Sequence, residues 1–173
     1  MQRPPDFSIA ALHGALDAQR KARGLSWEGL TREINAQFAD SRARPLSSST
    51  VSGLRTKSFV EADGVLQMLR WLGRTAESFV PGLADEATTG ATPRKLDAHQ
   101  ILRFDVTALH AALDARRMEG ALTWAQVADE IGGANAALLK RLAKGGRVAF
   151  PQVMRVIRWV GQPAATFTRA SDW

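Results

Sequence analysis

Apolar residues recur along this chain at the three- and four-residue intervals of amphipathic helices, and no segment alternates as a surface strand would. Ile9, Leu12 and Leu16 share one face of a helix that we predict from about Ser8, a suitable N-cap, to Arg23. The same spacing predicts three further helices. Their inward residues are Trp27, Leu30, Ile34 and Phe38, then Val51 and Leu54, then Val65, Leu69 and Leu72.

The pattern occurs twice. Residues 7–34, FSIAALHGALDAQRKARGLSWEGLTREI, align with residues 104–131, FDVTALHAALDARRMEGALTWAQVADEI, with 13 of 28 positions identical. Residues 54–79 align with residues 142–167 at 8 of 26 positions. The offset between the copies falls from 97 to 88 residues, so the first copy carries nine extra residues between its aligned segments. Such a repeat indicates that one helical module is duplicated.

The stretch between the copies, residues 83–100, is polar, mixes glycine, proline and threonine, and has no apolar period, which is typical of a linker. We therefore predict a module over residues 1–82, this linker, and a module over residues 101–173. A flexible linker of this length spans roughly 25 Å, so the modules could dock on each other or on two neighbouring sites. The predicted fold class is all-α, with four or five helices in each module. The expected aromatic anchors of the two cores are Trp27, Trp71, Trp124 and Trp159.

The charge of the chain bears on which kind of partner it would contact. The net charge is +6, and both modules are basic, which favours a polyanionic partner over an uncharged one. A soluble protein that is merely basic is the alternative. No run approaches the ~20 apolar residues of a membrane span. The opening MQRPPDFS lacks the apolar core of a signal peptide, so we expect a cytoplasmic protein without membrane association.

Residue types that carry catalysis or bind metals are scarce. The chain has three histidines, no cysteine and no tyrosine, and it contains no GxxxxGK[ST], GxSxG or HExxH motif. His13 and His110 occupy the same register of the first helix, without clustered carboxylates to complete a metal site. We interpret them as structural residues, and we expect no enzymatic activity and no cofactor.

The order of three segments is specific enough to suggest a family. LSWEGLTREI, SSTVSGLRTK and VLQMLRWLG in the first copy, and LTWAQVADEI, ALLKRLAKGG and VMRVIRWVG in the second, resemble the Cro/repressor-type, or XRE-like, helix-turn-helix family. The resemblance covers the chain except for the linker and the ends. It implies two lambda-repressor-like modules, double-stranded DNA as the partner and a role in transcription regulation, with each third helix in the major groove.

Carried onto the first copy, the resemblance assigns base contacts to Ser48, Ser49, Thr50 and Ser52. Serine and threonine hydroxyls bond several bases, so these residues would read sequence weakly. The flanking residues would contact phosphates: Arg42, Arg44, Ser47, Arg55 and Lys57. The alternatives are a solvated face with capping serines and, for the two loop arginines, a mobile charged loop.

The second copy differs at the matching positions. Ala136 and Ala137 replace hydroxyl residues, so this face is poor in hydrogen-bonding side chains. Its remaining polar residues suit phosphates better than bases: Asn135, Lys140, Arg141, Lys144 and Arg147. The second copy would therefore add affinity, or it has lost DNA and kept a docking role.

These observations favour a DNA-binding protein, with a protein–protein interaction module that keeps the fold but not the DNA face as the alternative. Two copies in one chain would mimic a dimer and place their third helices about 34 Å apart, one turn of DNA. A homodimer of the whole chain stays open as a second arrangement.

Overall fold

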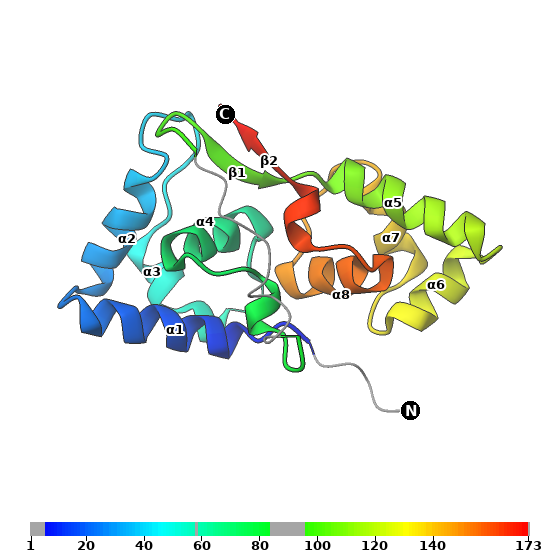
Figure 1. Ribbon diagram of the computed structural model, residues 1–173, viewed down its shortest axis with the longest axis horizontal. Helices are drawn as coiled ribbons and strands as arrows, with labels where there is room; N and C mark the ends of the chain where they lie inside the picture. The colour runs from blue at the N-terminus through cyan, green and yellow to red at the C-terminus, as the bar shows by residue number, and fades with distance from the viewer. Residues whose placement is uncertain (1–5, 58, 84–95, 173) are drawn as a thin grey trace.

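The computed structural model describes residues 6–57, 59–83 and 96–172, which contain eight α-helices and a two-stranded sheet (Figure 1). The first half comprises α1 (Ile9–Ala22), α2 (Trp27–Ala36), α3 (Ser48–Ser52), η1 (Leu54–Thr56), α4 (Ala62–Leu72) and η2 (Glu77–Phe79). The second half comprises β1 (Ile101–Phe104), α5 (Val106–Glu119), α6 (Trp124–Ile131), α7 (Ala136–Leu142), α8 (Phe150–Val160), η3 (Ala164–Phe167) and β2 (Thr168–Ser171). Among the described residues, no helix is long and apolar enough to cross a membrane.

The helices begin and end where the local sequence predicts. The hydroxyls of Ser8, Ser26 and Thr123 each accept a hydrogen bond from the backbone N–H three residues on, which caps α1, α2 and α6. Gly73 and Gly161 follow α4 and α8 in the left-handed conformation, at φ 65° and 78°, which only glycine adopts without strain. The predicted boundaries of these helices are thus confirmed within a residue or two.

The repeat in the sequence extends to the hydrogen bonds. In each half, the residue that caps the first helix donates its N–H to a phenylalanine carbonyl, an arginine binds the carbonyl of a leucine, and a tryptophan N–H binds a glutamate. Equivalent positions therefore make equivalent contacts. The pairs are Ser8–Phe79 and Asp105–Phe167 at 2.8 and 2.7 Å, Arg20–Leu25 and Arg117–Leu122 at 2.8 and 2.9 Å, and Trp71–Glu33 and Trp159–Glu130 at 3.0 and 2.8 Å.

The expectation of a chain without strands is wrong. β1 and β2 pair antiparallel, with Ile101 opposite Ser171 and Phe104 opposite Thr168. Each strand has four residues, and in β1 the two end residues are buried while the middle two are half-buried. That pattern does not alternate, so hydrophobic periodicity gives no strand signal here.

The two halves dock through equivalent segments. α4 and α8 are equivalent in the repeat and pack on each other at the centre of the molecule (Figure 1). Just before them, Glu61 and Ala149, 88 residues apart, form an antiparallel bridge. An antiparallel bridge between equivalent residues is the contact that a two-fold axis generates, so at this point the halves meet with approximate two-fold symmetry.

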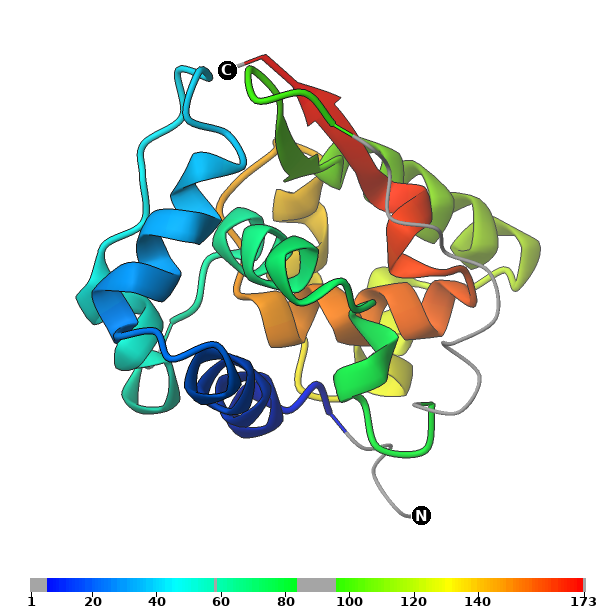
Figure 2. The same ribbon diagram turned by 60° about the vertical axis from the view of Figure 1, so that its left-hand side comes forward.

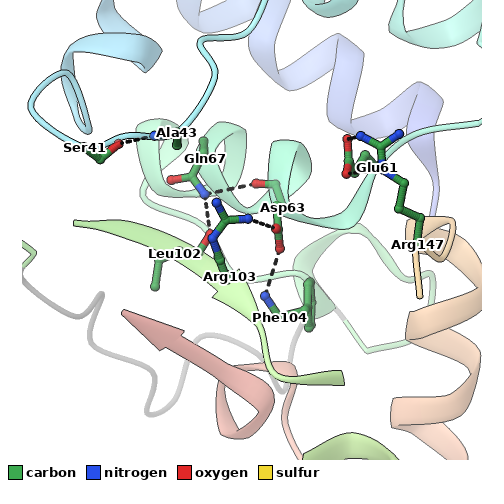
Figure 3. A network of polar contacts seen from close by, with 9 residues as sticks. All are labelled: Ser41, Ala43, Glu61, Asp63, Gln67, Leu102, Arg103, Phe104 and Arg147. Carbon is green, nitrogen blue, oxygen red and sulfur yellow. Dashed lines mark hydrogen bonds and ion pairs between the residues drawn. The ribbon is translucent and has the colours of Figure 1, made fainter. Parts of the chain in front are cut away.

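In each half, the segment before the first helix packs on the fourth helix of the other half. From the second half, Arg103 forms an ion pair with Asp63 of α4 at 2.9 Å, and the backbone N–H of Phe104 donates to the same carboxylate (Figure 3). From the first half, Asp6 forms an ion pair with Arg155 of α8 at 2.6 Å, and this hydrogen bonding raises the pKa of Arg155. The exchange is reciprocal, with the charges reversed.

Phe150 occupies the centre of this junction. Its side chain is fully buried, and its ring centroid lies 4.5 Å from that of Phe7 and 5.6 Å from that of Phe104, both in edge-to-face geometry. The equivalent residue of the first half is Ala62, which is also buried. One large side chain and one small one therefore stand at matching positions of the two halves.

The tryptophans do not fill the cores as expected. All four are half-buried and pack at the edge of the core, which consists of aliphatic and phenylalanine side chains. Their indole rings carry polar contacts: Trp27 lies beside His13 and beneath Arg20, and Trp71 donates to Glu33. A polar N–H and a neighbouring guanidinium favour a position at the rim, where water also reaches them.

The end of the expected linker packs on the first half. The carbonyl of Ala98 accepts from the N–H of Asp40 at 3.1 Å, and that of Leu96 accepts from Arg70 at 3.2 Å. In Figures 1 and 2 the loop after α2 correspondingly lies beside the segment that leads into β1. The rest of the expected linker, residues 84–95, lies outside the described residues.

We expect Phe150→Ala to lower the free energy of unfolding by about 3–5 kcal/mol, because it removes a fully buried ring and leaves a cavity between the halves. Urea unfolding followed by circular dichroism measures the loss. Phe59→Ala is the matched control: Phe59 is 47% exposed, and its removal should cost less than about 1 kcal/mol. Equal losses for the two variants would contradict this account of the junction.

Candidate nucleic-acid interface

A cluster of hydroxyls begins α3. Ser47 is the N-cap: its Oγ accepts from the backbone N–H of Thr50 at 3.2 Å and lies 2.8 Å from Thr50 Oγ1 and 3.1 Å from Ser49 Oγ. Ser49 is exposed, whereas Ser48 and Thr50 are half-buried. Of the residues expected to contact bases, Ser49 is therefore the most open, and the hydroxyl of Thr50 already has a partner within the helix.

The inward face of α3 is anchored on both sides. Val51 and Leu54 are fully buried, as predicted. His13 of α1 holds the end of the helix, because its Nε2 lies 3.0 Å from the carbonyl oxygen of Ser52. A carbonyl only accepts, so this nitrogen carries the hydrogen. The structural role expected for His13 accounts for these contacts, and Ser52 is half-buried beside it.

The nine extra residues of the first copy lie in the loop between α2 and α3, and hydrogen bonds hold this loop in place. Asn35 at the end of α2 clamps it: its side-chain amide donates to the carbonyl of Leu46 and accepts from the N–H of Leu46, both at 2.9 Å. Ser41 forms two further hydrogen bonds within the loop. Its hydroxyl donates to the carbonyl of Phe38. The same hydroxyl accepts from the N–H of Ala43 (Figure 3). The sequence interpretation missed Asn35, although an asparagine facing a polar loop is a common clamp.

Four cations surround α3, two on this loop and two after the helix. All four are exposed, and within the described residues their side chains have no hydrogen bond or ion pair. They are thus available to an anionic partner without breaking an existing contact. These residues are Arg42, Arg44, Arg55 and Lys57.

At the start of its third helix, the second half has fewer hydrogen-bonding side chains than the first half. Asn135 caps α7 by accepting from the N–H of Leu138 at 2.7 Å, so its side-chain oxygen is occupied. Ala137 is exposed and Ala136 half-buried, so the first two residues of α7 have no hydrogen-bonding side chain, and the exposed Asn135 before them is the polar residue at this end of the helix. On α7 and the turn that follows it, three exposed cations have no partner among the described residues: Lys140, Arg141 and Lys144.

Arg147 is engaged elsewhere. Its guanidinium forms an ion pair with Glu61 of the first half, with Nε 3.1 Å from Oε1 (Figure 3). The side chains are 79% and 49% exposed, so the pair contributes little to stability. Because it lies beside the bridge between Glu61 and Ala149, Arg147 belongs to the junction of the halves rather than to the surface of α7.

Helices α3 and α7 hold equivalent places in the two halves. α2 packs against α3, and α6 packs against α7. In Figure 1, α3 and α7 lie on opposite sides of the central α4–α8 pair. The segments that follow them meet at the bridge between Glu61 and Ala149.

No group of three or more potential metal ligands occurs among the described residues. His13 and His110 each stack on a tryptophan, at 5.1 and 5.4 Å between ring centroids. No protein-family model, curated protein or solved structure matches this chain.

We expect Ser47→Ala to lower the free energy of unfolding by about 1 kcal/mol, because the variant loses the N-cap of α3. Ser49→Ala removes a neighbouring hydroxyl that bonds no backbone group, and it should change stability by less than about 0.5 kcal/mol. Urea unfolding compares the two, and amide exchange at Thr50 reports the cap directly. Faster exchange in Ser49→Ala than in Ser47→Ala would refute the assignment of the cap.

Proposed function

We propose that this protein binds double-stranded DNA through two helix-turn-helix modules of the Cro/repressor type and regulates transcription. The observation that carries the proposal is the approximate two-fold relation between the halves, with a short capped helix and a set of exposed cations on each side of the axis. DNA is itself pseudo-symmetric, and two-fold related recognition helices match two half-sites on one face of the duplex.

In this proposal α3 enters the major groove of one half-site. Ser49 is the leading candidate for base contact, with Ser48 and Thr50 beside it. Hydroxyls bind several bases, so much of the affinity comes from phosphates. Arg55 and Lys57 extend from the chain just after the helix, and the clamped loop places Arg42 and Arg44 on the approach to it.

In the second half, α7 contributes mainly phosphate contacts. Lys140, Arg141 and Lys144 are exposed at its C-terminal end, whereas its first turn offers two alanines. The first half would then contact the bases of one half-site, and the second half would bind mainly the phosphates of the other. The two helices would lie about one turn of DNA apart, roughly 34 Å. The single chain acts as its own pseudo-dimer.

One observation favours a second candidate, a protein–protein interaction module. The alanines at the start of α7 and the engagement of Arg147 with Glu61 leave the second half with fewer polar groups for a nucleic acid. In that case α7 would present a small, flat surface to a protein, and affinity for DNA would be negligible in the native chain.

The deciding variant is Ser49→Asp with Thr50→Asp. Carboxylates in the first turn of a helix are favourable for the helix, but they repel phosphates, so the fold should persist while affinity for DNA falls at least about tenfold. Fluorescence anisotropy with a labelled random duplex, over a series of salt concentrations, measures the affinity. Circular dichroism verifies the fold.

Thr107→Asp with Ala111→Asp adds the same charge to exposed positions of α5 and serves as the matched control. Its affinity for DNA should stay within about threefold of the native value, because only the general field changes. If both double variants lose affinity equally, α3 is not the contact surface. If the native protein does not bind at low salt, the DNA proposal fails and the interaction module takes its place.

A triple variant tests the role given to the second half: Lys140→Ala, Arg141→Ala and Lys144→Ala. The slope of log K against log salt should become shallower by about 0.9 for each phosphate contact that is lost. The anisotropy series supplies both slopes. An unchanged slope would assign the second half a docking role without DNA contact.

A further inference from the structure

A cavity of about 410 Å³ lies where the two halves meet. One wall comes from α4 and the turn into η2, including Leu66, Leu69 and Arg70. The opposite wall comes from β1 and η3, including Leu102 and Ala164. Its volume is within the range of sites for small organic ligands, and its walls are mainly apolar.

Arg70 is the unusual group in this cavity. Its Nη2 donates to the carbonyl of Leu96 at 3.2 Å, but its Nη1 is buried and has no hydrogen-bond partner among the described residues. Burial lowers the pKa of Arg70, because removal from water disfavours the charged form. A guanidinium still keeps its proton in proteins, so the buried N–H lacks an acceptor. Buried polar groups in native structures are usually hydrogen-bonded to the protein, to water or to a ligand.

We propose that this cavity binds a small monocarboxylate with an apolar body, whose carboxylate accepts a hydrogen bond from Arg70 Nη1. The apolar body would pack against Leu66, Leu69 and Leu102. Carboxylate oxygens match the planar donors of a guanidinium, and a charge-assisted hydrogen bond of this kind is stronger than one between neutral groups.

The remaining charges favour one negative charge on the ligand rather than two. Glu77 also lines the cavity, and its Oε1 accepts from the N–H of Ala164 across the junction at 2.6 Å. Arg74 lies at the same wall, with its guanidinium over the ring of Phe79 at 4.3 Å from the centroid. A phosphate dianion would meet the Glu77 carboxylate without a second buried donor, whereas a monocarboxylate is balanced by Arg70 alone.

Because both halves line the cavity, an occupant contacts both and favours one relative position of the halves. On the proposed function, that position sets the spacing of α3 and α7, so the carboxylate would be an effector of DNA binding. The binding itself does not depend on the DNA proposal.

The test is isothermal titration calorimetry of the full chain without DNA, with hexanoate and 3-phenylpropionate as probes. Each carboxylate should bind at one site with a Kd of about 1 mM or tighter, a modest affinity for ligands of this size. The matched neutral amides, hexanamide and 3-phenylpropionamide, should bind at least about tenfold more weakly, because they lack the charge that Arg70 requires.

Arg70→Met should weaken the binding of both carboxylates at least about tenfold. The control is Arg158→Met, since Arg158 is the equivalent residue of the second half and does not line the cavity. It should leave the affinity unchanged. Ala165→Phe changes an exposed residue of the cavity wall, fills its mouth without altering charge, and should also abolish binding. Its melting temperature verifies folding independently of Arg70.

Absence of saturable binding of both carboxylates by the native chain would overturn the proposal, as would equal affinity for the amides or full retention in Arg70→Met. Anisotropy with DNA, measured with and without saturating 3-phenylpropionate, then separates the two proposals. A native chain that binds the carboxylate but not DNA keeps the cavity site and loses the proposed function.

Discussion

The two halves are held together by the segments that each of them extends across the junction onto the other. Residues 6–7 cross to α8 and β1 crosses to α4, so neither fourth helix is covered by its own half alone. A module of some 70 residues buries a small core, and the shared junction adds the fully buried Phe150 to it. The same exchange sets the approximate two-fold relation, the positions of α3 and α7, and the cavity beside Arg70.

Buried polar groups give this junction its specificity. Gln67 is almost completely buried in α4, and its amide donates to the carbonyl of Leu102 at 2.7 Å, which fixes β1 along the helix (Figure 3). Asp63 receives both a guanidinium and a backbone N–H from the same strand. Because a buried donor without an acceptor is costly, a shift of β1 by one residue would break several of these bonds at once. The halves therefore dock in one register.

The helices and their caps could be predicted from the sequence because they depend on local rules. Ser8, Ser26 and Gly73 act within one turn of their own position, and the buried stripes follow the helical period. The strands could not be predicted, since β1 and β2 are short and exist through contacts with residues far away in the chain. The rim position of the tryptophans depends in the same way on distant partners such as Glu33.

For the candidate interface, the sequence identified which residues are exposed and cationic, but not which of them already have partners. In the sequence, Arg147 and Arg141 look alike, because both are basic residues near the third helix of the second half. In the structure, Arg147 pairs with Glu61 at the junction. The role of Asn35 could not be predicted, because its partner Leu46 lies on the other side of a loop. Hydrophobic periodicity does not describe the path of a loop. Pairing across a junction is a tertiary property, and single-residue patterns do not contain it.

The junction joins two copies of one module, but the charges and the side-chain sizes at its equivalent positions differ between the copies. Ala62 and Phe150 stand at equivalent positions, as do Asp6 and Arg103. Two first modules would place Asp6 against Gln67, the equivalent of Arg155, and would leave the volume of Phe150 empty. Two second modules would place Arg103 against Pro151, the equivalent of Asp63, and would crowd two phenylalanines together. A pair of like modules would thus lose the ion pairs of the junction and mismatch it in volume, so these contacts favour the pairing of the two unlike modules within one chain.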